Sequence, residues 1–168
     1  MNVQLSPQGA LFISRLEGCV LECYDDGGSP GVGNCTIGVG HLVHHGPTTQ
    51  ADKQHWGSIS QEHALALLQA DAHSNGVVAI QQNVHVELTQ GQVDALISLC
   101  FNCGPGALDP GGSVAQAVNA KPKVWNPVAM RKWRDGVRAA MMLWNKPAVL
   151  IGRRTKECDL FCTGKYAA

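Results

Sequence analysis

Hairpin-type sequence gives way to helix-type sequence once along the chain, and this change most limits the folds that are possible. Residues 24–42 are rich in glycine, proline and β-branched side chains. Turn formers interleaved with β-branched residues predict a small hairpin lobe. From Ser60 onward the apolar residues recur at helical spacing. The sequence therefore predicts an α+β fold with its strands confined to the first lobe.

Helix starts recur outside the hairpin segment. Phe12, Ile13 and Leu16 follow one start at helical spacing, and that helix is expected to end near Glu17. The helix that starts at Ser60 is expected to reach about residue 80. Residues 44–56 are polar and predict a loop. The other starts are Ser6-Pro7, the capping box Thr89-Gln90-Gly91-Gln92, and Asn126-Pro127.

A chain of 168 residues predicts one domain with two lobes. The β lobe is expected at about 17–58, and the helical lobe at about 60–168 together with the N-terminal helix. The first residues carry no basic segment followed by an apolar run, and no apolar stretch approaches the ~18 residues of a membrane span. We therefore expect the protein to be made and folded in a cytoplasm.

The net charge is zero, but the charges are unevenly distributed. Residues 121–168 hold 11 of the 13 lysines and arginines and 3 of the 13 acidic residues, a net charge of +8. Residues 1–120 carry the compensating −8. A basic segment suits an anionic partner such as an envelope surface or nucleic acid, or it forms a solvated helix face. The sequence leaves these alternatives open.

The seven cysteines do not form a metal-binding pattern. Zinc sites in sequence usually show two closely spaced cysteine pairs with the same short spacing, and only one pair here has two intervening residues. His41, His44 and His45 have no cysteine or carboxylate at ligand spacing. No metal is expected, and reduced, partly buried thiols are favoured. The cysteines are Cys19, Cys23, Cys35, Cys100, Cys103, Cys158 and Cys162.

A glutamate, an aspartate and a threonine around the hairpin segment form a candidate hydrolytic set. Glycoside hydrolysis uses one protonated carboxyl as acid and one carboxylate that directs water or attacks the sugar. Glu17 is expected in the last turn of a helix, where the helix dipole disfavours its charge. Asp26 lies in a loop, and the hydroxyl of Thr36 can hold a water against it. Asp25 and Glu22 compete with Asp26 on spacing alone.

Four ordered blocks make the chain similar to the phage-type lysozymes, glycoside hydrolase family 24. The first block joins Glu17-Gly18, Tyr24-x-Asp26 and the run Thr36-Ile37-Gly38-Val39-Gly40-His41, with eight residues between its glutamate and aspartate, as in that family. The other blocks are Leu88-Thr89-x-x-Gln92-x-x-Ala95-Leu96, Phe101-Asn102-x-Gly104 and Gly152-Arg153-Arg154-x-x-Glu157-x-x-Leu160-Phe161. The resemblance covers nearly the whole chain.

This resemblance implies a lysozyme-like fold and a muramidase that cleaves peptidoglycan between N-acetylmuramic acid and N-acetylglucosamine, without a cofactor. Carried over by position, Glu17 is the acid, Asp26 orients or activates water, and Thr36 holds that water. Arg153, rather than Arg154, is expected to approach Glu17 as structural support. The residues expected to bind substrate or support the site are His41, Leu42, Phe101 and Asn102.

One departure from the family pattern falls at the site itself. Nine residues separate Asp26 from Thr36, where the common pattern has five. The extra length most simply enlarges a hairpin turn and leaves its ends in place. A water held between Asp26 and Thr36 needs room, so the sequence predicts inversion at the anomeric carbon.

The resemblance also implies a biological setting. A phage endolysin would be made in the cytoplasm of the host bacterium and reach the cell wall in the periplasm through a holin-type pore. We expect a monomer whose partner is peptidoglycan and not nucleic acid. A bacterial effector is an alternative setting. A different class of function also stays open, namely a membrane-active or peptidoglycan-binding module that acts through the basic C-terminal helices.

Overall fold

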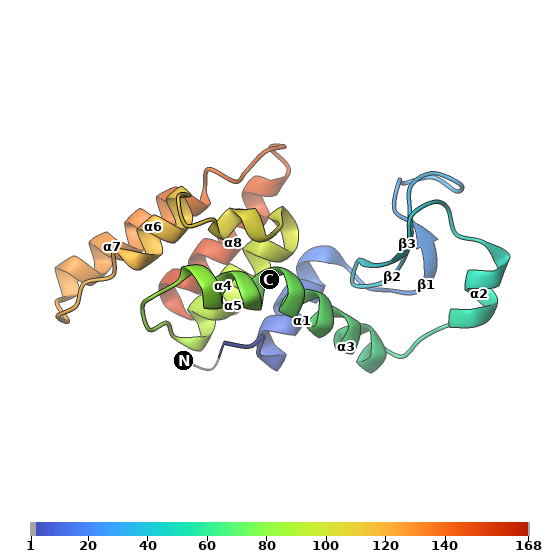
Figure 1. The fold of residues 1–168 in the computed structure, drawn as a ribbon, viewed down its shortest axis with the longest axis horizontal. Helices are drawn as coiled ribbons and strands as arrows, with labels where there is room; N and C mark the ends of the chain where they lie inside the picture. Colours follow the sequence, from blue (N-terminus) through green and yellow to red (C-terminus); the bar gives the residue numbers. More distant parts are fainter. Residues whose placement is uncertain (1–2, 168) are drawn as a thin grey trace. The chain divides into compact units, whose positions relative to one another are not determined.

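The protein contains one small antiparallel sheet, and helices make up most of the rest of the chain (Figure 1). The computed structural model describes residues 3–167, which divide into two compact units. The sheet unit comprises residues 10–71, and the helical unit comprises residues 1–9 with 72–168. The strands lie only in the sheet unit, as far as residues 3–167 show, so the predicted α+β class is confirmed.

The sheet is a three-stranded meander in the order β1-β2-β3. Thr36 of β2 lies opposite Tyr24 of β1, and Cys35 lies opposite both Asp25 of β1 and His44 of β3. An irregularity in the β2–β3 register falls between Cys35 and Thr36. The elements of this part of the chain are α1 (Pro7–Glu17), β1 (Val20–Asp25), β2 (Cys35–Gly38), β3 (His41–His44), α2 (Gln50–Trp56) and α3 (Gln61–Ala72).

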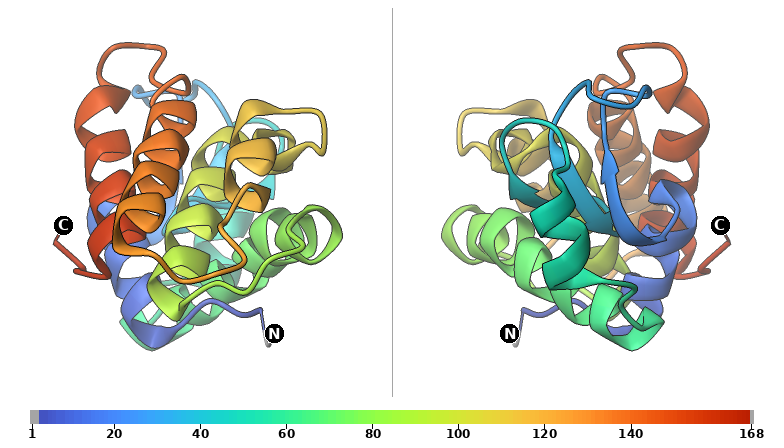
Figure 2. Two further views of the ribbon diagram at one scale, coloured as in Figure 1. Left: turned by 90° about the vertical axis from the view of Figure 1, so that its left-hand side faces the viewer. Right: turned by 90° about the vertical axis from the view of Figure 1, so that its right-hand side faces the viewer.

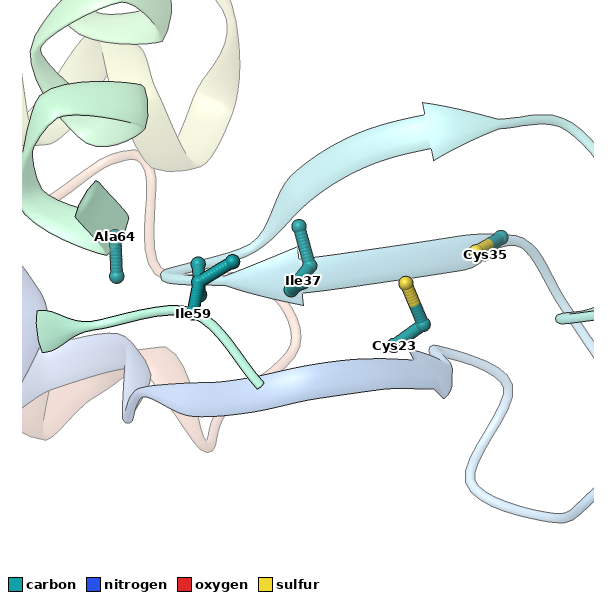
Figure 3. Close-up of a cluster of buried hydrophobic side chains, with 5 residues drawn as sticks. All are labelled: Cys23, Cys35, Ile37, Ile59 and Ala64. Carbon is teal, nitrogen blue, oxygen red and sulfur yellow. The ribbon is translucent and has the colours of Figure 1, made fainter. Parts of the chain in front are cut away.

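A compact apolar cluster covers one face of the sheet. Figure 3 shows Cys23 and Cys35 with their sulfur atoms turned toward one another between β1 and β2. Ile37, Ile59 and Ala64 complete this cluster, and Ile37 is fully buried. Because side chains alternate along a strand, Cys35 and Ile37 share the buried face of β2.

Residues 44–56 do not form the loop expected from their polarity. Residues 50–56 form helix α2, whose first turn is fixed by a capping box. Asp52 N donates to Thr49 Oγ1 at 3.2 Å, and Thr49 N donates to Asp52 Oδ2 at 2.8 Å. These reciprocal bonds satisfy backbone donors that a helix start leaves unpaired. The helix has no buried residue, so no apolar period marked it in the sequence.

Helix α5 (Gln90–Cys103) is the centre of the helical unit. The predicted capping box forms between Thr89 and Gln92, and every residue from 91 to 100 is buried. Helix α5 packs against α8 (Leu150–Thr163), and α7 (Pro127–Met141) lies beside α8 (Figure 2). The remaining elements are η1 (His73–Val77), α4 (Val78–Asn83), η2 (Pro105–Leu108) and α6 (Ser113–Asn119).

The predicted helix after Ser60 is confirmed, with one change of geometry. Helical conformation continues from Gln61 to Asn83 through α3, the π-helical turn η1 and α4. No helix within residues 3–167 has both the length and the apolar character that crossing a bilayer requires.

Candidate active site

Glu17 is the last residue of α1, where the sequence predicted it. Gly18 N donates to Ser14 O at 2.9 Å, and Gly18 then turns the chain out of the helix with a φ of 85°. Glycine adopts this left-handed conformation without the steric cost that a side chain brings. The Glu17 side chain is exposed and lies at the negative end of the helix dipole. A sugar oxygen can therefore reach it directly.

Asp26 follows directly after β1 and is held by the far side of the enlarged turn. Asn34 N donates to Asp26 Oδ1 at 2.7 Å, and Asn34 Nδ2 donates to Asp26 Oδ2 at 3.3 Å. Asp26 N donates in return to Asn34 O at 3.1 Å. The carboxylate is exposed, and its oxygens retain further acceptor sites for a water. The enlarged turn thus fixes Asp26 rather than displacing it.

Thr36 is connected to Asp26 through the same asparagine. Its hydroxyl donates to Asn34 O at 3.3 Å, and the side chain is only 4% exposed. Asn34 O therefore accepts from both Asp26 N and Thr36 Oγ1. The sequence did not indicate Asn34, because it lies inside the extra length of the turn, where no family position corresponds to it.

Tyr24 connects the two carboxylates electrostatically. Burial raises the pKa of the Tyr24 phenol, and the charges of Asp26, Glu17 and the nearby Cys19 raise it further. Both carboxylates therefore lie within electrostatic range of the Tyr24 phenol. Tyr24 carried the sequence resemblance without an assigned role.

Asp25, one of the competitors for Asp26, is engaged in holding two loops. Thr48 N and Gly31 N each donate to its carboxylate at 2.6 Å. The bonds from Thr48 and then Gly31 hold the pKa of Asp25 below its usual value. The other competitor, Glu22, is exposed on β1, where its backbone pairs with Ser58 in an isolated bridge. Asp25 is therefore a structural residue that joins the enlarged turn to the segment before α2.

In Asp25→Asn, the melting temperature is expected to fall less steeply than in the wild type as the pH decreases below neutral. Because the folded state lowers the pKa of Asp25, its ionised form stabilises the fold above the unfolded value of about 3.9, and this stabilisation is lost as the pH falls through the folded value. The melting temperature of Asp25→Asn should lie below that of the wild type at pH 7, and the two should converge toward pH 3. A constant difference at every pH would contradict this role.

Gly33 has no side chain, which leaves room for the Asp26 carboxylate. It has a φ of 97°, and a Cβ there would overlap Asp26 Oδ1 and the Gly27 backbone. Gly33→Ala is expected to lower kcat/KM by about 10- to 100-fold, because a misplaced catalytic group costs this much. Gly28→Ala is the matched control, since Gly28 has a φ of 79° in the same turn with open space around it. Equal losses of kcat/KM in both variants would contradict the claim that Gly33 makes room for the Asp26 carboxylate.

His41 and Leu42 begin β3. His41 Nδ1 pairs with Asp71 Oδ2 at 2.9 Å, and the imidazole meets Trp56 edge to face. These contacts make His41 a supporting residue whose ring is held by α3 and α2. Leu42 is 44% exposed.

The remaining candidates lie in the helical unit around a buried ion-pair network. Asn102 Oδ1 accepts from Arg154 Nη2 at 2.7 Å, and Phe101 beside it is half-buried. Arg153 Nε pairs with Glu157 Oε1 at 2.9 Å. Arg154, which is fully buried, pairs with Glu157 Oε2. The Arg-Arg-x-x-Glu motif therefore builds a structural network, and Asn102 belongs to it.

Comparisons with known proteins show the family and the fold. The model of the phage lysozyme family matches residues 14–157. The chain is 34% identical over 163 residues to the endolysin of Salmonella phage P22, covering 95% of this chain and 98% of that one. An endolysin structure from Escherichia coli O157:H7 phage FAHEc1 matches with a TM-score of 0.77 and 28% identity over 100% and 99% of the two chains. The muramidase domain of SpmX from Asticaccaulis excentricus matches with a TM-score of 0.69 and 29% identity over 95% and 98%.

Proposed function

Because the chain belongs to the phage lysozyme family and is a peptidoglycan-degrading lysozyme, we propose that Glu17 and Asp26 carry its chemistry. The observation that supports this assignment most directly is the hydrogen-bonded turn in which Asn34 holds both Asp26 and Thr36. The bond cleaved is the β-1,4 bond between N-acetylmuramic acid and N-acetylglucosamine. The two units act together as one lysozyme-like domain, without a cofactor.

Glu17 protonates the leaving glycosidic oxygen in this proposal. Its place at the end of α1 and its exposure let substrate reach it. Asp26 directs a water toward the anomeric carbon, and Thr36 helps to hold that water. Asn34 positions Asp26 and Thr36 together through its backbone oxygen and side chain.

The other candidates bind substrate or support the two carboxyls. Leu42 and Phe101 contribute apolar surface to the sugar site, and His41 holds the start of β3 through Asp71. Asn102 contributes from the end of α5, where Arg154 orients its side-chain oxygen. Arg153 supports Glu17, in addition to its pairing with Glu157.

The muropeptides released by the enzyme test the proposed bond. Purified peptidoglycan is digested, the new reducing ends are reduced with borohydride, and the products are identified by mass spectrometry. We expect the reduced sugar to be N-acetylmuramic acid. Reduced N-acetylglucosamine, or cleavage confined to the peptide stems, would contradict the proposal.

The stereochemistry of the first-formed product tests the role of the water. With Asp26 directing a water held by Thr36, the anomeric carbon inverts, which corresponds to carboxyl groups about 6.5–9.5 Å apart. Nuclear magnetic resonance of the fresh product should show the α-anomer from the β-linked glycan. An initial β-anomer would instead mean that the carboxylate attacks and that configuration is retained.

The exposed apolar residues before α7 favour a second candidate function on the same scaffold. Val124 and Trp125 are 79% and 75% exposed, and they lie in the segment with a net charge of +8. Cationic segments with exposed tryptophan suit an anionic membrane surface. Killing of permeabilised bacteria by Glu17→Gln at the wild-type rate would support this function, whereas loss of killing in that variant would assign it to glycan cleavage.

The proposed setting follows from the endolysin relatives. The enzyme is made in the cytoplasm of a host bacterium, passes a holin-type pore and acts as a monomer on the wall in the periplasm, with no nucleic-acid partner. Expression in Escherichia coli with and without a holin tests this route. Lysis only when both are present is expected, and equal lysis by the enzyme alone would contradict the pore requirement.

A further inference from the structure

Three side chains that can bind a metal ion, each from a different element, lie close together in the sheet unit. They are Cys35 of β2, His44 of β3 and Asp52 of α2, and one ligand atom from each lies within 4.8 Å of the other two. Cys35 is fully buried, and the Asp52 side chain is 16% exposed. The sheet register explains the meeting, because Cys35 and His44 are direct cross-strand partners.

Cys23 lies beside Cys35 on the neighbouring strand. Figure 3 shows its sulfur directed from β1 toward that of Cys35. In the sheet register Cys23 is a diagonal neighbour of Cys35, because Asp25 lies directly opposite.

We propose that Cys23, Cys35, His44 and Asp52 bind one zinc ion. Two sulfurs, one imidazole nitrogen and one carboxylate oxygen form a tetrahedral ligand set of the kind that structural zinc takes. Two thiolates on one zinc stand about 3.7 Å apart, given tetrahedral Zn–S bonds of about 2.3 Å. Diagonal strand neighbours suit that spacing better than a disulfide, whose Cβ atoms must approach to about 3.5–4.5 Å.

The surroundings of His44 and Asp52 already orient them for this role. His44 Nδ1 lies 3.0 Å from His45 O and can donate to it, which leaves Nε2 free to bind a metal in place of its contact with Asp52. Asp52 Oδ2 accepts from Thr49 Oγ1 at 2.6 Å and from Thr49 N at 2.8 Å. Thr49 thereby fixes the Asp52 carboxylate where it meets His44 Nε2 at 3.0 Å.

Cys23 borders a surface cavity, and a bound ion would stabilise this part of the sheet unit. Cys23 and Lys53 line a surface cavity of about 540 Å³ that also reaches Thr48. A bound ion would join all three strands to α2. Cys35 directly precedes Thr36, so the ion would also fasten the end of β2 that holds the catalytic turn. On binding, protons leave the thiols and are replaced by bonds to zinc.

Cobalt and zinc titrations of the full chain test this site. Protein stripped with chelator under reducing conditions should bind one Co²⁺ with a thiolate-to-cobalt charge-transfer absorption, and Zn²⁺ should displace it and raise the melting temperature. His44→Ala should weaken Zn²⁺ binding by at least about 100-fold, since even the partners of ligands contribute 10- to 100-fold. His44 is the safest ligand to replace, because its side chain is 39% exposed.

Two further variants separate this site from the other thiols. Cys23→Ser should abolish the charge-transfer absorption. Cys162→Ser should leave it unchanged, because Cys162 lies on α8 and is not one of the four proposed ligands. Absence of a thiolate–cobalt band in folded, reduced protein would overturn the proposal. So would a band that survives Cys23→Ser, or a Cys23–Cys35 disulfide in protein that takes up no Zn²⁺ after reduction.

Discussion

Glu17→Gln is expected to lose about 10²- to 10⁴-fold in kcat/KM on peptidoglycan, the usual contribution of a general acid. Glutamine keeps the shape of the side chain but cannot give a proton to the glycosidic oxygen. The fold should be unaffected, because the Glu17 side chain is exposed and replacing such a residue changes the free energy of unfolding by no more than about 0.5 kcal/mol. Turbidity loss of a peptidoglycan suspension measures the rate, and urea unfolding measures the stability.

Glu22→Gln is the matched control for this variant. Glu22 is also an exposed glutamate in the sheet unit, and the substitution removes the same charge. It should keep the wild-type rate, because Glu22 lies on β1 and has no role in the proposed proton transfer. A similar loss in both variants would mean that overall charge, and not proton donation at Glu17, controls the rate.

Arg154→Met is expected to cause the largest loss of stability, about 3–5 kcal/mol, because it removes the fully buried partner of the Glu157 carboxylate and leaves Arg153 to compensate its charge. Arg154 is fully buried and also donates to Asn102 Oδ1 at 2.7 Å and to Trp144 O at 2.9 Å. For a chain of this length, such a loss lowers the melting temperature by roughly 6–20 °C. Thermal unfolding followed by circular dichroism measures it.

Two further variants test whether the loss of a buried charge partner for Glu157 causes this drop in stability. Arg138→Met breaks the Arg138–Asp159 pair, whose side chains are 36% and 50% exposed, and should cost no more than about 1 kcal/mol. Adding Glu157→Gln to Arg154→Met should recover part of the loss, because the buried charge is then removed. A loss as large in Arg138→Met, or no recovery in the double variant, would contradict this explanation.

The sequence predicted those parts of the fold that depend on local chemistry. The capping box Thr89–Gln92 and the apolar period behind it predicted α5, and the structure confirms both. The end of α1 was also predictable, because Gly18 takes the left-handed conformation that ends a helix after Glu17. Residues 17, 26 and 36 were singled out by the family spacing, and two of them turn out to be connected through Asn34.

Features that depend on pairing across the sheet could not be read from the chain. Asn34 holds Asp26 only because the enlarged turn closes on itself, and no sequence period marks that closure. Cys35 and His44 are nine residues apart, which is no recognised ligand spacing, yet the β2–β3 register makes them partners. The polarity of α2 hid the helix that brings Asp52 to them.

The central proposal is that Glu17 and Asp26 act together in catalysis. Its most direct test is a double-mutant cycle in kcat/KM. Wild type, Glu17→Gln, Asp26→Asn and the double variant are compared on the same peptidoglycan, with unfolding measured for each. Residues that act as a unit give strongly non-additive losses. We expect the double variant to be about as slow as the slower single variant. Losses that multiply, or a wild-type rate in Asp26→Asn, would contradict the proposal.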